Sequence, residues 1–228
     1  MARMEQTMAK PIGLNTSQLQ TLTAVVEEPY FLETFYLSGG TALASWYLFH
    51  RESYDLDFFS ERPFDYEKIR RWFRQFEKKL GFSTIRFDDD YGFLICYLRY
   101  QDDSILKVDF NNYAASRLRS GLQWKGLSID SEYDICVNKV RTIAVSPRTR
   151  DYVDLYCILK VNKYSLKDIL NDVKIKFHEE LDLLQLAHNL LNVEQATDFP
   201  IMLIPFEKND MVKFFQKLSD SLKTSIFR

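Results

Sequence analysis

The stretch LSGGTALASWYLFHRESYDLDFF, residues 37–59, decides the fold, because a glycine turn and a helix here connect an apolar strand to an acidic one. Phe35–Leu37 predicts a short buried strand, Thr41–His50 has the dense apolar period of a helix, and Asp55–Phe59 predicts the second strand. The Ser38-Gly39-Gly40 turn between them lets a phosphate approach the backbone. A tight strand-to-helix turn explains the glycine pair equally well, so the pair alone is a weak signal.

The acidic strand carries Asp55 and Asp57 at positions i and i+2, so both carboxylates project from one face while Leu56 turns into the core. Two adjacent carboxylates repel each other unless a cation lies between them. Mg²⁺ is the usual cation, held by one or two carboxylates together with substrate phosphates. A solvated strand edge is the more common explanation of such a pair taken alone.

A third acid, Asp109, lies between apolar residues in Lys107-Val108-Asp109-Phe110. If this strand neighbours Asp55–Phe59, three carboxylates face the glycine turn. That combination is far more specific than any of its parts, and it predicts a two-metal site for phosphoryl or nucleotidyl transfer.

The rest of the chain divides near residue 130 into an α+β half and a helical half. In the first half, helices are expected at Ser17–Glu28 and Asp65–Leu80, and strands at Ser83–Phe87, Phe93–Tyr100, Ile105–Asn111 and Leu122–Ile129. The cluster Asp88–Asp90 is expected at a hairpin tip of an antiparallel meander. In the second half, helical periods run over 132–145, 149–161, 165–176, 179–191 and 207–224. The domains expected are therefore 1–130 and 131–228.

Composition excludes several classes of protein. The 228 residues are 46% hydrophobic and 27% charged, which is typical of an ordinary globular protein. Thirty Lys+Arg against 32 Asp+Glu leave no global basic footprint, so a nucleic acid would need a local patch. The best such patch is the basic face of the helix at 65–80, which is equally explained as a solvated surface. No run of 18 apolar residues occurs, so no membrane span is expected.

Cysteine usage and the N-terminal sequence bear on the compartment. Cys96, Cys136 and Cys157 each lie in an apolar run and are expected to be buried, reduced thiols. MARMEQTMAKPIG contains no apolar segment of the signal-peptide kind. A cytoplasmic protein is therefore expected.

With these residues in place, the first motif resembles the AbiEii/AbiGii toxin family of bacterial nucleotidyltransferases, within the polymerase-beta-like nucleotidyltransferase superfamily. The superfamily pattern is a strand, Gly-Gly or Gly-Ser, a D-h-D strand and a distant third acid. Fourteen residues, 41–54, separate the glycines from the acidic strand, a slightly long gap that the AbiEii-like branch shares. The resemblance covers roughly residues 30–160 and implies a mixed sheet with flanking helices, followed by an α-helical C-terminal lobe.

A late motif supports the same family. Its lysine, Arg-Asp pair and following aspartate correspond to Lys139, Arg150-Asp151 and Asp154 in VNKVRTIAVSPRTRDYVDLYCIL. Asp151 and Asp154 are three residues apart and share one helix face. Ser146 stands where the family often has an arginine, and Arg148 follows two residues later, so either Arg148 or Arg150 faces the substrate.

The resemblance implies a role for each residue. Asp55, Asp57 and Asp109 would bind Mg²⁺, and Ser38, Gly39, Gly40 and Thr41 would cradle the triphosphate. Lys139 would contact phosphates, Asp151 would orient groups or accept a proton, and Arg150 and Asp154 would belong to the nucleotide site. Arg51 would either contact phosphate or pair with Glu52 or another acid, and Ser53 would either donate to phosphate or cap the turn.

The expected function is transfer of an NMP from an NTP to a hydroxyl acceptor on RNA, such as a tRNA end, by the toxin of a bacterial toxin–antitoxin or phage-defence pair. An antitoxin protein is an expected partner, and a monomer is favoured. Two rivals stay open: a nucleotidyltransferase that modifies a small molecule such as an antibiotic, and a non-catalytic binding module on the same fold.

Overall fold

The computed structural model describes residues 11–226, which form two compact units. The first unit consists of the described residues up to Tyr47, together with Ser53–Ser116 and Ser120–Asp130. The second consists of Leu48–Glu52, Arg117–Arg119 and the chain from Ser131 onward. That 1–130 and 131–228 are separate domains stays a prediction, because compactness alone does not test independent folding. Most of the segment examined for a signal peptide lies outside the described residues.

The first unit is built on a seven-stranded mixed sheet in the order β3-β4-β5-β2-β1-β7-β6. The strands are β1 (Tyr36–Ser38), β2 (Leu56–Ser60), β3 (Thr84–Asp90), β4 (Phe93–Arg99), β5 (Ile105–Asn112), β6 (Gln123–Trp124) and β7 (Leu127–Ile129). Strand β2 pairs antiparallel with β1 and parallel with β5, while β3, β4 and β5 form the expected antiparallel meander. The predicted α+β fold with a mixed sheet is confirmed.

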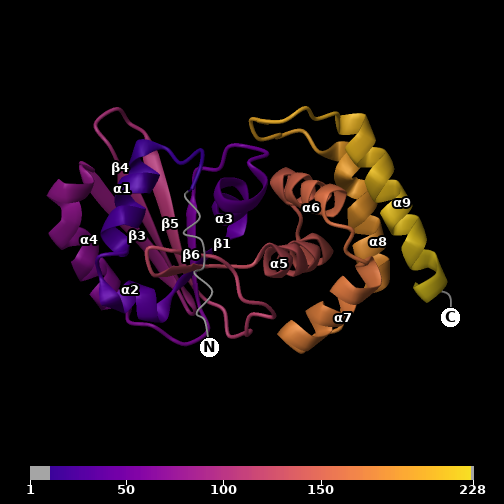
Figure 1. Ribbon diagram of the computed structural model, residues 1–228, viewed down its shortest axis with the longest axis horizontal. Helices are drawn as coiled ribbons and strands as arrows, with labels where there is room; N and C mark the ends of the chain where they lie inside the picture. The colour runs from indigo at the N-terminus through magenta and orange to yellow at the C-terminus, as the bar shows by residue number, and fades with distance from the viewer. Residues whose placement is uncertain (1–10, 227–228) are drawn as a thin grey trace, which may run out of the picture. The chain divides into compact units, whose positions relative to one another are not determined.

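One face of this sheet is covered by α1 (Thr16–Val25), α2 (Pro29–Thr34) and α4 (Tyr66–Leu80), which Figure 1 shows on the same side. Aromatic rings fill the space between: Phe31 of α2 contacts Trp72 of α4 and Phe110 of β5. The alternation of β2 and β5 explains this, since Phe58 and Phe110 point into that core and stack on each other. The acidic residues between them therefore project from the opposite face.

The second unit is helical. Its helices are α5 (Glu132–Val145), α6 (Thr149–Val161), α7 (Leu166–Phe177), α8 (Leu183–Leu191), the short 3₁₀ helix η2 (Asn192–Gln195) and α9 (Lys208–Ile226). Helix α5 packs against α6, α7 and α8, and α8 packs along α9 (Figure 1). Among the described residues, no helix is long and apolar enough to cross a membrane.

Two segments from early in the chain belong to this helical unit. The backbone of 50–52 pairs with 201–203, through Leu203 N–H to the His50 carbonyl and Glu52 N–H to the Ile201 carbonyl, both at 2.9 Å. Residues 117–119 are held by the fully buried Asp134, whose carboxylate accepts two backbone N–H bonds there and an ion pair from Lys176. Buried carboxylates need such partners, because an unpaired charge is costly to bury.

The structure corrects several expected boundaries. Asp88–Asp90 is not the hairpin tip: it continues β3 in register with β4, and the turn is Tyr91-Gly92. The helix expected at Ser17–Glu28 ends at Val25, and α2 follows as a separate short helix beginning with Pro29. The strand expected at Leu122–Ile129 is a small hairpin, β6 and β7. Helix α3 (Gly39–Leu43) passes into a π-helical turn, Ala44–Leu48, where one continuous helix was expected.

Candidate active site

The acids of the sheet lie on neighbouring strands, as predicted. Asp57 of β2 and Asp109 of β5 are register partners in a parallel pair, so their side chains leave the same face of the sheet. Both residues are partly buried, and the Asp109 side chain is 14% exposed. The prediction that the strand containing Lys107–Phe110 adjoins the D-x-D strand is confirmed, while metal binding by the acids stays a prediction.

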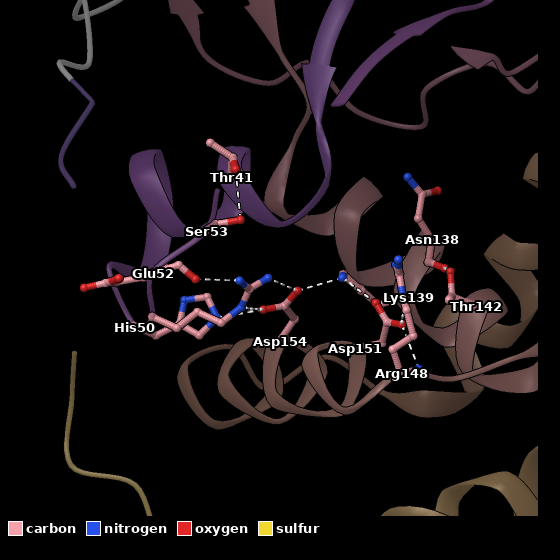
Figure 2. Close-up of polar contacts among 11 residues, drawn as sticks. Thr41, His50, Glu52, Ser53, Asn138, Lys139, Thr142, Arg148, Asp151 and Asp154 are labelled. Atoms are coloured by element: carbon pink, nitrogen blue, oxygen red, sulfur yellow. Dashed lines mark hydrogen bonds and ion pairs between the residues drawn. The ribbon is translucent and has the colours of Figure 1, made fainter. Parts of the chain in front are cut away.

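Asp55 lies just before β2, which begins at Leu56. The Thr41 hydroxyl donates to the Asp55 backbone carbonyl and is hydrogen-bonded to the Ser53 hydroxyl at 2.9 Å (Figure 2). The Gln18 side chain also donates to the Ser53 carbonyl, at 2.9 Å. Thr41 and Ser53 thus hold the segment that leads into the acidic strand. This contact supports a local structural role for Ser53, the alternative to donation to a phosphate.

The glycine turn approaches Asp57 closely. Ser38, the last residue of β1, is the register partner of Asp57, and Gly39 follows with φ +73°. A β-carbon at Gly39 would lie 2.9 Å from Asp57 Cγ, closer than side-chain carbons pack. Only glycine combines this backbone angle with this proximity. The backbone of Gly39 and Gly40 therefore stands beside the acid face.

The hydroxyl of Ser38 is used within the protein. It donates to Asp130 Oδ2 at 2.7 Å, and both residues are buried. The Tyr47 hydroxyl donates to the Asp130 carbonyl at 2.9 Å. Sequence reasoning missed Asp130, although its place directly after an apolar strand was a usable signal. In the turn that was expected to hold phosphates, Gly39 and Gly40 have only backbone groups with which to bind a phosphate. The hydroxyls of Ser38 and Thr41 are hydrogen-bonded within the protein.

Lys107 is a member of the acid face that sequence reasoning also missed. Its ammonium donates to Asp109 Oδ2, two residues along β5 on the same face. Burial by itself lowers the pKa of Lys107, while the hydrogen bond to Asp109 raises it. The charges of Asp109, Asp55 and Asp57 raise it further, so the pKa lies above the ordinary lysine value. Three carboxylates therefore act on one cation.

The donor set on this face suits Mg²⁺, which prefers carboxylate oxygens. Lys107 shows that the face already attracts a cation, and the close approach of Gly39 leaves backbone beside Asp57. Within residues 11–226, however, no group of three or more His, Cys, Asp or Glu side chains stands ready to hold a metal ion. The residues fit the ion in the chemistry of their oxygen donors.

The late motif forms a separate buried cluster in the helical unit (Figure 2). Asp154 of α6, fully buried, accepts Arg51 Nε at 2.6 Å on Oδ1 and the second guanidinium nitrogen at 2.9 Å on Oδ2. His50 Nε2 lies 2.9 Å from Oδ1, and Lys139 Nζ lies 2.6 Å from Oδ2. The Arg51 guanidinium was expected to contact either a phosphate or an acid, and in the structure it donates to Asp154.

Asp151 extends this cluster along the same face of α6. Its Oδ1 lies 2.7 Å from Lys139 Nζ, so both carboxylates of the motif meet one ammonium, in agreement with the prediction that they share one helix face. Its Oδ2 accepts the Arg148 backbone N–H at 3.0 Å and Nε at 3.2 Å. Arg148 is therefore the arginine that contacts Asp151, whereas Arg150 lies partly buried in the first turn of α6.

These contacts set the charge state of both aspartates. Burial raises the pKa of Asp151, but Lys139 and then Arg148 outweigh it and lower the pKa. Burial likewise opposes ionisation of Asp154, yet the charges of Lys139 and Arg51 and the hydrogen bonds from His50 and Arg51 hold its pKa well below the usual range. Both are ionised at neutral pH, which favours an orienting role for Asp151 over proton acceptance.

The three cysteines are buried free thiols, as predicted. Burial is the main cause that raises the pKa of Cys136 and of Cys157 to about 12, so neither is a thiolate at neutral pH.

Solved structures share this fold. JHP933 from Helicobacter pylori is 17% identical with a TM-score of 0.53, over 93% of this chain and 97% of that one. A candidate nucleotidyltransferase from H. pylori is 16% identical with a TM-score of 0.57, over the same shares of the two chains. An uncharacterized protein of Aquifex aeolicus is 28% identical over 175 residues, 72% of this chain and 76% of that protein. The fold is that of nucleotidyltransferases.

The family model described as "Nucleotidyl transferase AbiEii toxin, Type IV TA system" matches residues 20–224. The chain therefore belongs to the AbiEii nucleotidyl transferase family and is a nucleotidyltransferase. The match includes both motifs and extends beyond residue 160, where sequence reasoning found no motif.

Proposed function

We propose that this nucleotidyltransferase moves an NMP from an NTP to a hydroxyl of RNA, such as a tRNA end, as the toxin of a bacterial toxin–antitoxin pair. The observation that carries the transfer chemistry is the register pairing of Asp57 with Asp109 beside Gly39. The toxin role and an antitoxin partner rest on the family to which the chain belongs.

In this proposal the acceptor hydroxyl oxygen attacks the α-phosphorus, a new P–O bond forms, and the bond to the β-phosphate breaks to release pyrophosphate. The hydroxyl proton leaves to solvent or a nearby base. Asp55, Asp57 and Asp109 would hold Mg²⁺, which would lower the charge of the triphosphate and orient it. The backbone of Gly39 and Gly40 would leave room for the phosphates next to these acids.

Lys139 is proposed to contact the phosphates, as the family resemblance of the late motif implies. An ammonium has three N–H donors, and the contacts described here with Asp151 and Asp154 use two of them. A third is available to a phosphate oxygen. Asp151 would orient Lys139, while Asp154 would position Lys139 and Arg51 from its buried place, rather than touch the nucleotide itself. Arg150 remains a candidate for the nucleotide site.

The test is transfer of label from each α-labelled NTP, with Mg²⁺, into total RNA or into aminoglycosides. We expect labelled RNA and unlabelled aminoglycoside. The Asp57→Asn variant should lose labelling, whereas Asp88→Asn should keep it, because Asp88 lies on the same sheet in an exposed ion pair with Arg86. Label in the aminoglycoside alone would favour the small-molecule enzyme, and no transfer despite Mg²⁺-dependent NTP binding would favour the binding module.

A further inference from the structure

The ion pair between Lys107 and Asp109 is less exposed to solvent than the pair between Lys79 and Glu27 of the same unit. The Lys107 side chain is 30% exposed and Asp109 is 14% exposed, so water screens the pair only in part. By contrast, Lys79 and Glu27 are 51% and 55% exposed. An ammonium in a partly buried place close to several carboxylates is strongly attracted there, because screening is weak.

The alternation of β5 places Lys107 and Asp109 on the face that also carries Asp57. The ammonium contacts Oδ2 of Asp109, a residue that the proposed function assigns to a metal ion. A cation that approaches this oxygen meets the positive charge of Lys107 at close range. The two cations therefore compete for one carboxylate.

The Lys107 side chain is long and flexible enough to move away from Asp109. Lysine carries its charge on a flexible four-carbon stem with three rotatable donors, and it binds phosphate as a point charge. The contact with Asp109 is made by the ammonium at the end of this stem, so rotation of the side chain would break it without movement of the strand. Release of Asp109 by Lys107 would free a ligand and place a cation within reach of an incoming triphosphate.

We propose that Lys107 is a cation placeholder: its ammonium neutralises the acid face before substrate arrives, yields Asp109 to a divalent cation, and then binds a phosphate oxygen of the NTP. This inference rests on the proposed function. It assigns to Lys107 a part in both metal binding and nucleotide binding, and it explains why a lysine stands two residues before the third acid.

The test measures binding of Mg²⁺ alone, without nucleotide, by calorimetry on the full chain. Lys107→Met removes the charge and keeps the length of the side chain. We expect it to bind Mg²⁺ about tenfold more tightly than the unmodified protein, the order by which a nearby charge changes the affinity of a carboxylate for a proton. At saturating Mg²⁺ the same variant should show a raised KM for the NTP.

Lys79→Met is the matched control, since it removes one lysine from an ion pair of the same unit away from the acids. It should bind Mg²⁺ as the unmodified protein does. Equal or weaker Mg²⁺ binding by Lys107→Met would overturn the inference, and so would equal tightening in both variants, which would indicate a general charge effect. Circular dichroism confirms that each variant is folded.

A third variant separates this inference from the proposed function. If Asp57→Asn binds Mg²⁺ as well as the unmodified protein, the metal site and the proposed function fail together. If Asp57→Asn abolishes binding while Lys107→Met leaves it unchanged, only the role of Lys107 is overturned.

Discussion

Two polar clusters among the described residues have opposite arrangements of charge. On the sheet of the first unit, carboxylates surround a cation: Asp109 contacts Lys107, and Asp55 and Asp57 act on it through their charge. In the helical unit, cations surround a carboxylate: Arg51 and Lys139 both bind Asp154. Carboxylates therefore predominate around the first ion pair, and cations predominate around the second.

Burial separates the two clusters as well. The acids of the sheet keep some contact with solvent, so they can exchange one partner for another at modest cost. Asp154 is fully buried, and taking away any of its partners would leave a charge in a medium of low polarity. The comparison teaches that ion pairs of the same residue types can differ in how much solvent they meet, and the proposed roles, exchange of ions on the sheet and fixed positioning in the helical unit, follow from that difference.

The largest effect is expected on transfer when an acid of the sheet is changed. Asp57→Ala should lower the rate by about 10³-fold or more, since a carboxylate at the metal site stabilises the transition state by several kcal/mol. The melting temperature without Mg²⁺ should stay equal or rise, because carboxylate repulsion is relieved. Single-turnover labelling and thermal unfolding measure the two quantities. Asp57→Ala with near wild-type labelling would end the assignment.

The opposite outcome is expected for the buried carboxylate. Asp154→Asn should cost about 3 kcal/mol of unfolding free energy, because it removes the buried negative charge that Arg51 and Lys139 both contact. Urea titration followed by circular dichroism gives the free energy. Asp88→Asn is the control, and an exposed pair of this kind contributes about 0–1 kcal/mol. A similar small loss in both variants would contradict the positioning role of Asp154.

The stability that Asp151 and Asp154 contribute should depend on pH. The pKa values of Asp151 and Asp154 are lowered in the folded state, so their stabilisation is present above the unfolded value and is lost as the pH falls below about 4. Melting temperature measured from pH 7 to pH 2.5 should therefore fall steeply only at the acid end. Asp154→Asn should flatten that fall, and an unchanged slope would count against these pKa shifts.

The smallest effect concerns the glycine turn. Gly39→Ala and Gly92→Ala both force alanine to a positive φ, but only Gly39 lies against Asp57, while Gly92 faces open space. Both should cost about 1 kcal/mol of stability from the backbone. Gly39→Ala should cost more and also slow transfer, because it displaces the carboxylate. Equal stability and equal transfer in the two variants would show that the close approach has no role.

The fold was predictable where local pattern determines structure. The two-residue period of Leu56-Asp57-Phe58 put an acid on one face and apolar side chains on the other, and the structure agrees. Asp88–Asp90 was assigned to a turn from composition, yet pairing of Asp88 and Asp89 with Ile95 and Leu94 keeps them in a strand. Partners across the sheet outweighed local propensity there.

The site was predictable in part for the same reason. The pairing of Asp57 with Asp109 was expected from the motif, and Asp151 and Asp154 from their helical spacing. His50 and Asp130 were missed as participants, because nothing in their immediate sequence names a partner far along the chain; Lys107 was missed although its partner Asp109 follows two residues later. His50 and Asp154, for example, are 104 residues apart.

The pairing of 50–52 with 201–203 has a consequence for the order of events during synthesis. A growing chain lacks the backbone partners of His50 and Glu52 until Leu203, of 228 residues, has been added. The stretch leading to Asp55 is therefore completed almost last, although it is translated early. A shortened product that stops before residue 201 would carry Asp55, Asp57 and Asp109 and still leave residues 50–52 without these backbone partners.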